Sequence, residues 1–216
     1  MVEWTAIAGI GLVALGMVLT PGPNMIYLVS RTIAQGRRAG YVSLLGVAAG
    51  FAVYLVAAAA GLSAVFVLVP VLYTALKIAG AAYLLWLAWQ AFRPGGTSVF
   101  APKELPADPP RKLFTMGLVT SLLNPKIAIL YVSLLPQFID PAGGPVAVQS
   151  LVLGLTQIAV GVTFNGLFVF GAGGIAAFLG RRPLWLKTQR YFMGTVLAGL
   201  AFHLALGKGR PAAALP

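Results

Sequence analysis

The chain has 216 residues, of which 59% are hydrophobic and 9% are charged. A soluble domain carries roughly 25% charged residues, so this composition excludes a soluble globular protein and predicts an integral membrane protein. The net charge of +11 is spread over several loops, which favours anionic lipid headgroups over nucleic acid as neighbours of the basic residues. The absence of cysteine excludes disulfides and thiolate metal sites.

Six apolar stretches are candidates for membrane-spanning helices, which need about 20 largely apolar residues each. In chain order they cover residues 4–30, 41–67, 71–92, 114–139, 146–179 and 191–206, the fifth being long enough to tilt or break. The first is interpreted as a retained helix rather than a signal peptide, because its only early charge is Glu3 and its apolar run is long. We expect one all-α transmembrane domain over residues 1–216: three helices in 1–92, a loop in 93–113, three helices in 114–207 and a tail in 208–216.

Most basic residues lie in alternate connections between these stretches. They follow the first, third and fifth stretches, as Arg31, Arg37, Arg38, Arg93, Lys103, Arg111, Lys112, Arg181, Arg182, Lys187 and Arg190. Lysine and arginine accumulate in cytoplasmic loops. The pattern therefore predicts that these connections are cytoplasmic and that both termini are periplasmic.

Prolines interrupt the first and fourth stretches. The first contains LTPGPN at residues 19–24, and the fourth contains LLNPK at residues 122–126. Thr20 and Asn24 correspond to Thr120 and Asn124 at a shift of 100 residues. Halves that each cross the membrane three times have opposite orientation, and transporters commonly place their site at broken helices in corresponding positions. We therefore expect six helices in an inverted 3+3 repeat, with helices one and four broken.

The residues at these breaks suit a small zwitterionic ligand. Pro21, Pro23 and Pro125 leave earlier carbonyls without partners, which is tolerated in a membrane where the freed groups line a cavity or are buried in protein. A half-helix that begins at a break offers N–H groups to a carboxylate, and the amides of Asn24 and Asn124 each offer a donor and an acceptor. The alternative is that the prolines only kink the helices and the asparagines cap the kinks.

Two lysines lie within predicted helices. Lys126 lies about 12 residues into the fourth, or about 18 Å at 1.5 Å per residue, and a charge at that depth indicates function. Lys77 lies only about six residues into the third, from which a lysine also reaches the outer headgroups. The four carboxylates, Glu3, Glu104, Asp108 and Asp140, fall at helix ends or in loops. Asp140, at the outer end of the fourth helix, is the nearest candidate for ion coupling, with a plain loop role as the alternative.

No pattern of a known enzyme is present. The sequence lacks the G-x-S-x-G, Walker A and H-E-x-x-H motifs, and His203 is its only histidine. The sequence therefore predicts neither an enzyme, nor a cofactor, nor a metal site.

Three stretches of the sequence resemble the hallmark segments of the lysine exporter superfamily, and within it those of the homoserine/threonine resistance (LysE/RhtB) branch. They are LTPGPNMIYLVSRTIAQGRRAGYVSLLGVAAG, LKIAGAAYLLWLAWQAF and FTMGLVTSLLNPKIAILYVSLLPQFID. The family motifs fall on Pro21, Gly22, Pro23, Asn24, Lys77, Gly80, Tyr83, Asn124, Pro125, Lys126 and Asp140.

The resemblance implies a bacterial inner-membrane exporter of amino acids or their derivatives, driven by protons. The expected substrate is then an amino acid of the homoserine or threonine type or another neutral amino acid. Whether the protein forms a homodimer is left open. The alternatives are a passive channel, a transporter of another small solute and, last, a membrane enzyme.

Overall fold

The computed structural model describes residues 2–20, 22–68 and 107–180, with individual residues between 78 and 93 and between 191 and 206. Every regular element in this part of the chain is helical, as the composition predicts. The described residues of 78–92 and 191–206 are also helical, within the third and sixth predicted stretches. Pro21, Lys77, Gly80, Tyr83, His203 and the loops around Lys103 and Lys187 lie outside the described residues.

The first predicted helix is broken at its prolines. α1 (Trp4–Leu19) ends at Thr20, whose backbone is extended (φ −78°, ψ 126°), and α2 (Pro23–Leu68) begins at the second proline. A proline at the first position of a helix removes no intrahelical hydrogen bond and already has a helical φ. The expected break therefore occurs, and the chain resumes as a helix within a few residues.

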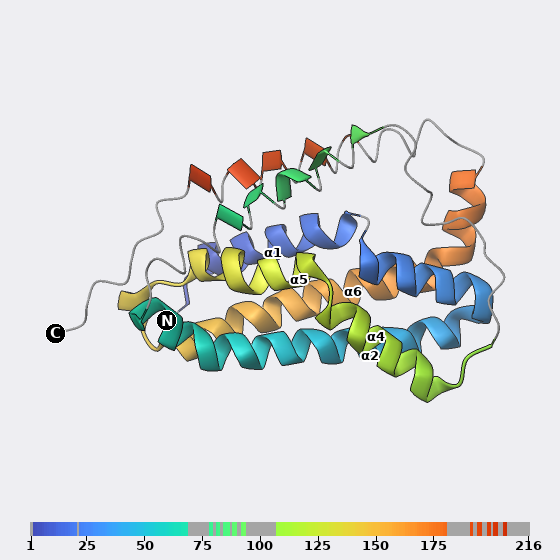
Figure 1. The fold of residues 1–216 in the computed structure, drawn as a ribbon, viewed down its shortest axis with the longest axis horizontal. Helices are drawn as coiled ribbons and strands as arrows, with labels where there is room; N and C mark the ends of the chain where they lie inside the picture. Colours follow the sequence, from blue (N-terminus) through green and yellow to red (C-terminus); the bar gives the residue numbers. More distant parts are fainter. Residues whose placement is uncertain are drawn as a thin grey trace.

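A single glycine replaces the loop that the sequence predicts between the first two stretches. α2 continues through the basic segment 31–40 and is interrupted only at Gly36, with φ 85° and ψ 169°. A positive φ of this kind is readily adopted only by glycine. The chain turns back at this bend (Figure 1), and the hydroxyl of Ser43 donates to that of Tyr27 at 3.1 Å across the two limbs of α2. The predicted loop is thus wrong in length, because one residue is enough for the reversal.

The fourth predicted helix is also broken. α4 (Pro110–Leu122) and α5 (Pro125–Ile129) meet at a bend of 49°, with Asn124 as the N-cap of α5. The chain then continues through a π-helical turn, η1 (Leu130–Leu134), and the 3₁₀ turns η2 (Leu135–Phe138) and η3 (Pro141–Gly143). Pro136 lacks an N–H group and so interrupts the regular α pattern around it. α6 (Val146–Gly180) is continuous, within one residue of the predicted fifth stretch.

Glycines let the helices approach closely. α2 packs against α4 and α6, and α1 packs against α6. A Cβ atom on Gly46 would lie 2.0 Å from the Phe114 carbonyl oxygen, and one on Gly117 would lie 2.3 Å from the Ser43 carbonyl oxygen. Small residues at such contacts are typical of membrane helices, in which packing rather than hydrophobic burial holds the helices together. The α2–α4 contact therefore requires glycine on both helices.

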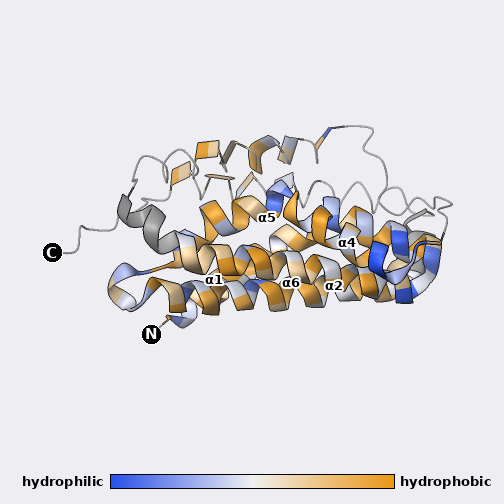
Figure 2. Ribbon diagram, turned by 60° about the horizontal axis from the view of Figure 1, so that its bottom comes forward, coloured by the Kyte–Doolittle hydropathy of each residue, from blue (hydrophilic) through white to orange (hydrophobic). Residues whose placement is uncertain are grey.

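The outer surface of the bundle is apolar. Large hydrophobic side chains are exposed on every long helix, among them Leu12, Leu45, Val56, Leu155 and Phe170. Figure 2 shows hydrophobic colour along the helices and hydrophilic colour at the end where α4 begins. By length and composition, 23–61, which includes the bend at Gly36, and 146–172 each qualify as membrane-spanning among the described residues. The bent pair 110–122 and 125–138 gives a third span if its two halves are counted as one.

Candidate functional site

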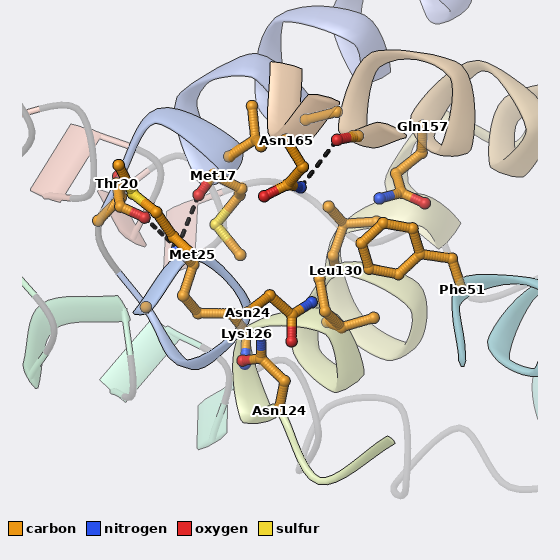
Figure 3. A pocket seen from close by; sticks show the side chains of 15 residues that line it. Met17, Thr20, Asn24, Met25, Phe51, Asn124, Lys126, Leu130, Gln157 and Asn165 are labelled. Carbon is orange, nitrogen blue, oxygen red and sulfur yellow. Dashed lines mark hydrogen bonds between the residues drawn. The ribbon is translucent and has the colours of Figure 1, made fainter. Parts of the chain in front are cut away.

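A pocket lies where the two helix breaks meet. Its lining comes from α1, α2, α5, α6 and the break between α1 and α2: Ala14, Met17, Val18, Thr20, Gly22, Asn24, Met25, Phe51, Asn124, Lys126, Ile127, Leu130, Gln157, Gly161 and Asn165. Figure 3 shows the side chains of Asn24, Asn124 and Lys126 close to one another, with Leu130 next to Asn24 and with Phe51 farther along the pocket beside Gln157. The structure thus brings Gly22, Asn24, Asn124 and Lys126, all singled out from the sequence, to one place.

Lys126 connects the second break to the first. Its ammonium group donates to the carbonyl oxygens of Met17, at 2.6 Å, and of Thr20, at 2.7 Å (Figure 3). The residue is only 4% exposed. A Cβ atom on Gly22 would lie 3.0 Å from Lys126 Cδ and 3.1 Å from its Nζ, so the absence of a side chain at residue 22 leaves room for the lysine.

The prolines of the first break explain why these two carbonyls are available. Met17 lies four residues before Pro21, whose nitrogen carries no hydrogen, so the usual helical hydrogen bond to the Met17 carbonyl cannot form. Thr20 follows the last residue of α1, and α2 begins only at Pro23. The C-terminal end of a helix carries a partial negative charge of about 0.5 elementary units, which attracts a cation. The ammonium of Lys126 therefore caps the end of α1 from a distant part of the chain.

Asn24 has a buried amide that pairs with none of the residues the structure describes. The residue is 6% exposed, and neither Oδ1 nor Nδ2 makes a hydrogen bond to any described residue. Leaving a buried polar group unpaired costs roughly 1–3 kcal/mol. An unpaired amide that lines a pocket is therefore a candidate for ligand contact, since a ligand that pairs with it would recover this free energy.

Asn124 behaves differently from its counterpart. Its Oδ1 accepts the backbone N–H of Lys126 at 3.1 Å, which makes Asn124 the N-cap of α5. The alternative in which the asparagines cap the kinks thus describes Asn124 but not Asn24. Asn124 still lines the pocket, so its capping role does not exclude it from the site.

Tyrosines that were not singled out from the sequence stabilise the second break. In a continuous helix the Leu122 carbonyl would accept the N–H of Lys126, but that N–H donates to Asn124 Oδ1. The Leu122 carbonyl accepts the Tyr54 hydroxyl instead, at 2.7 Å. Tyr54 stacks on Tyr131 with ring centroids 5.7 Å apart. Tyr131 donates to Gln157 Oε1 at 2.6 Å, so the amide NH₂ of that glutamine remains for other partners. The tyrosine spacing alone contains no signal for these contacts, because they join helices far apart in sequence.

The remaining walls combine α6 amides with apolar side chains. Gln157 and Asn165 are both buried, and Asn165 Nδ2 donates to the Gly161 carbonyl at 2.8 Å. Phe51 packs close to Gly161, where an added Cβ atom would lie 3.1 Å from its ring. The pocket therefore combines polar groups from the breaks and from α6 with apolar side chains.

Asp140 lies outside the pocket lining. It is exposed and caps η3, where its Oδ1 accepts the N–H of Ala142 at 3.0 Å. Its backbone N–H and C=O both bind the side chain of Gln149, at 3.0 and 2.7 Å. These contacts fix the connection between η2 and α6.

A second buried charge, not singled out from the sequence, lies at the start of α4. Asp108, whose side chain is 5% exposed, pairs with Arg31 and with Lys112, the latter at 2.7 Å. Gln35 Nε2 also donates to its carboxylate at 3.1 Å, and the Asp108 N–H donates to Gln35 Oε1 at 2.9 Å. Hydrogen bonds from Lys112 and Gln35, with the positive charge of Arg31, hold the pKa of Asp108 below its ordinary value of 3.8. This cluster joins the chain before α4 to the first limb of α2.

Comparison with known proteins gives a consistent result over nearly the whole chain. Residues 15–208 match the family model described as LysE type translocator. The chain is 31% identical over 206 residues to a leucine efflux protein of Enterobacter sp., covering 94% of each. It is 30% identical over 192 residues to a leucine efflux protein of Klebsiella pneumoniae subsp. pneumoniae, covering 89% of this chain and 91% of the relative. No solved structure matches the chain.

Proposed function

Because the chain belongs to the LysE type translocator family of amino-acid efflux transporters, we propose that it exports a neutral amino acid of the leucine type through the pocket between the helix breaks. Members of this family are transporters and not enzymes. The observation that carries the proposal is that one pocket is lined by the buried amide of Asn24, which pairs with no described residue, by the buried Lys126 and by the ring of Phe51. A zwitterion with an apolar side chain needs polar groups of this kind facing an apolar wall.

The leucine-type substrate is favoured by the apolar wall and by the names of the relatives. Met17, Met25, Phe51, Ile127 and Leu130 line the pocket together. Membership of the homoserine/threonine resistance branch would instead favour a substrate with a hydroxyl group. An apolar pocket separates substrates that differ by one or two methyl groups by about 10- to 200-fold, so a direct comparison of leucine with threonine distinguishes the two.

In this proposal Asn24, Asn124 and Lys126 bind the substrate, and Pro21, Gly22, Pro23 and Pro125 shape the backbone around it. Pro21 and Lys77 lie outside the described residues, and their roles rest on the sequence. Proton coupling is assigned to Lys126, because it is a buried group that can carry or release a proton between the two breaks. Lys77 and Asp140 are secondary candidates for coupling.

The proposed architecture is six spans in an inverted 3+3 repeat in the bacterial inner membrane, with both termini periplasmic. It is supported by two broken helices that meet at one pocket and by the alternation of basic segments along the chain. Reporter fusions near Arg37, Lys103 and Lys187 should all report a cytoplasmic location. A periplasmic location for the Lys103 fusion would contradict both the orientation and the inverted repeat. Assembly as a homodimer is a further proposal, which the mass of the detergent-solubilised protein tests.

The decisive experiment is a panel of radiolabelled amino acids tested for uptake into inverted membrane vesicles, in which an exporter pumps inward. We expect leucine to be taken up, threonine to be taken up at least about tenfold less well, and uptake to depend on an imposed pH gradient. Uptake that ignores the gradient would favour a passive channel. Preference for threonine would place the chain with the homoserine/threonine exporters.

A further inference from the structure

The end of α1 forms a small binding site for an ammonium group. The carbonyl oxygens of Met17 and Thr20 lie 2.6 and 2.7 Å from Lys126 Nζ, close enough to hold one nitrogen between them. Both carbonyls belong to the first break, whereas the nitrogen arrives on a side chain from the second. Nothing in this arrangement requires the nitrogen to belong to a lysine, because the acceptors recognise only N–H donors and positive charge.

The charge of Lys126 is incompletely compensated. An ammonium group has three N–H donors, and among the described residues it finds only the two carbonyl acceptors and no carboxylate. Neutral carbonyls and the partial charge of a helix end offset a buried cation less well than an ionised carboxylate does. A ligand that supplies a carboxylate near Lys126 would therefore bind to the group that lacks a counter-charge.

We propose that the Met17 and Thr20 carbonyls are the binding site for the substrate's α-ammonium group, and that Lys126 occupies this site only until the substrate arrives. The substrate carboxylate pairs with Lys126 and draws its ammonium away, while the substrate ammonium takes its place on the two carbonyls. This rests on the proposed function, in which an α-amino acid enters this pocket. The exchange leaves both carbonyls paired, and it adds a counter-charge to the lysine.

The exchange also has a mechanical consequence. In the present structure Lys126 ties the end of α1 directly to α5. After the exchange the same two helices are joined through the substrate. The contact between the two breaks therefore changes when the pocket is loaded, because the direct link through Lys126 is replaced by one that passes through the substrate.

The binding site can be tested separately from transport. In Lys126→Met the two carbonyls lose their ammonium, so small primary ammonium ions should bind in its place. We expect methylammonium to raise the melting temperature of the purified variant by about 2–4 °C, as a ligand of the folded state does. Tetramethylammonium carries the same charge without N–H donors and should not produce this rise.

Two proteins serve as controls. The unmodified protein already holds Lys126 in the site, and Lys112→Met removes a lysine whose side chain is 58% exposed and does not line the pocket. Neither should respond to methylammonium more than to tetramethylammonium. Equal responses of Lys126→Met to the two ions, or no response to either, would overturn the proposal.

A second measurement uses the unmodified protein, in case the Lys126 variant does not fold. Competition against labelled leucine compares leucine with 4-methylpentanoate, which lacks the ammonium, and with 3-methylbutylamine, which lacks the carboxylate. The first compound can pair only with Lys126 and the second only with the two carbonyls. Each should therefore compete at least about tenfold less well than leucine. If 4-methylpentanoate competes as well as leucine does, the ammonium group contributes nothing and the proposal fails. If leucine itself neither binds nor is transported while the methylammonium response of Lys126→Met persists, the proposed function fails and the carbonyl site stands.

Discussion

Lys126, which is buried, and Asp108, which is partly buried, are two charges of the same chain with opposite surroundings. Asp108 contacts two cationic side chains and an amide, and its backbone N–H is paired as well. Lys126 contacts two neutral carbonyl oxygens and, among the described residues, no acid. Asp108 connects the chain before α4 to α2. Lys126 connects α5 to the end of α1.

The difference separates a structural connection from a binding site. A charge that is fully paired holds two segments together and has no hydrogen-bonding capacity left for a ligand. A buried charge with only partial compensation favours any ligand that brings the opposite charge. The amide of Asn24, which pairs with no described residue, lines the same pocket as Lys126, so this region offers two groups to a ligand.

The largest effect should follow from changing Lys126. Lys126→Met removes the charge, and we expect leucine export to fall about 10- to 100-fold, which corresponds to the roughly 1.5–3 kcal/mol of a hydrogen bond to a charged group. Lys126→Arg should also lose export, because a planar guanidinium does not fit the space that Gly22 leaves for an ammonium. Lys112→Met is the matched control and should export normally. Full export by Lys126→Arg would show that charge alone is sufficient, and full export by Lys126→Met would remove the residue from the mechanism.

Asn24 and Asn124 should both matter for export but differ in their effect on stability. Asn24→Ala removes an unpaired buried amide, so export should fall strongly while the melting temperature stays the same or rises. Asn124→Ala removes the N-cap of α5, so it should lose export and about 0.5–2 kcal/mol of stability. Export assays and thermal unfolding of the two purified variants check this difference. Normal export by both variants would mean that the substrate binds elsewhere.

Asp108→Asn should show the reverse pattern. The variant loses the charge that Arg31 and Lys112 share, so the melting temperature should fall by a few degrees. Leucine uptake per folded molecule should stay close to that of the unmodified protein, because the cluster contributes nothing to the pocket lining. A loss of uptake as severe as that of Lys126→Met would show that this cluster takes part in the transport cycle.

The smallest effect concerns pH. The pKa of Asp108 in the folded protein lies below its ordinary value of 3.8. The stability that it contributes is therefore complete above that value and is lost as the pH falls through the lower, folded-state pKa. The melting temperatures of the unmodified protein and of Asp108→Asn should differ by a constant amount between about pH 5 and pH 8. A difference that changes within that range would indicate that another group titrates with the cluster.

Local features of the sequence were enough to predict the membrane class and the breaks at Pro21–Pro23 and Pro125. Hydrophobicity and the missing N–H of proline act on the segment that contains them, so they can be interpreted without knowing the fold. The turn at Gly36 was missed because polar and basic residues around it suggested a longer loop, whereas a single positive φ reverses the chain.

Only the tertiary structure decided which groups meet. Lys126 binds carbonyls that precede it by 109 and 106 residues, and Tyr54 binds the Leu122 carbonyl 68 residues away. The sequence presents Asn24 and Asn124 as equivalents, yet Asn124 caps a helix and Asn24 pairs with no residue in the described part of the chain. A side chain's role at a break depends on which distant donors lie within hydrogen-bond distance of the freed carbonyls. The packing of α1, α2, α5 and α6 around one pocket determines these distances.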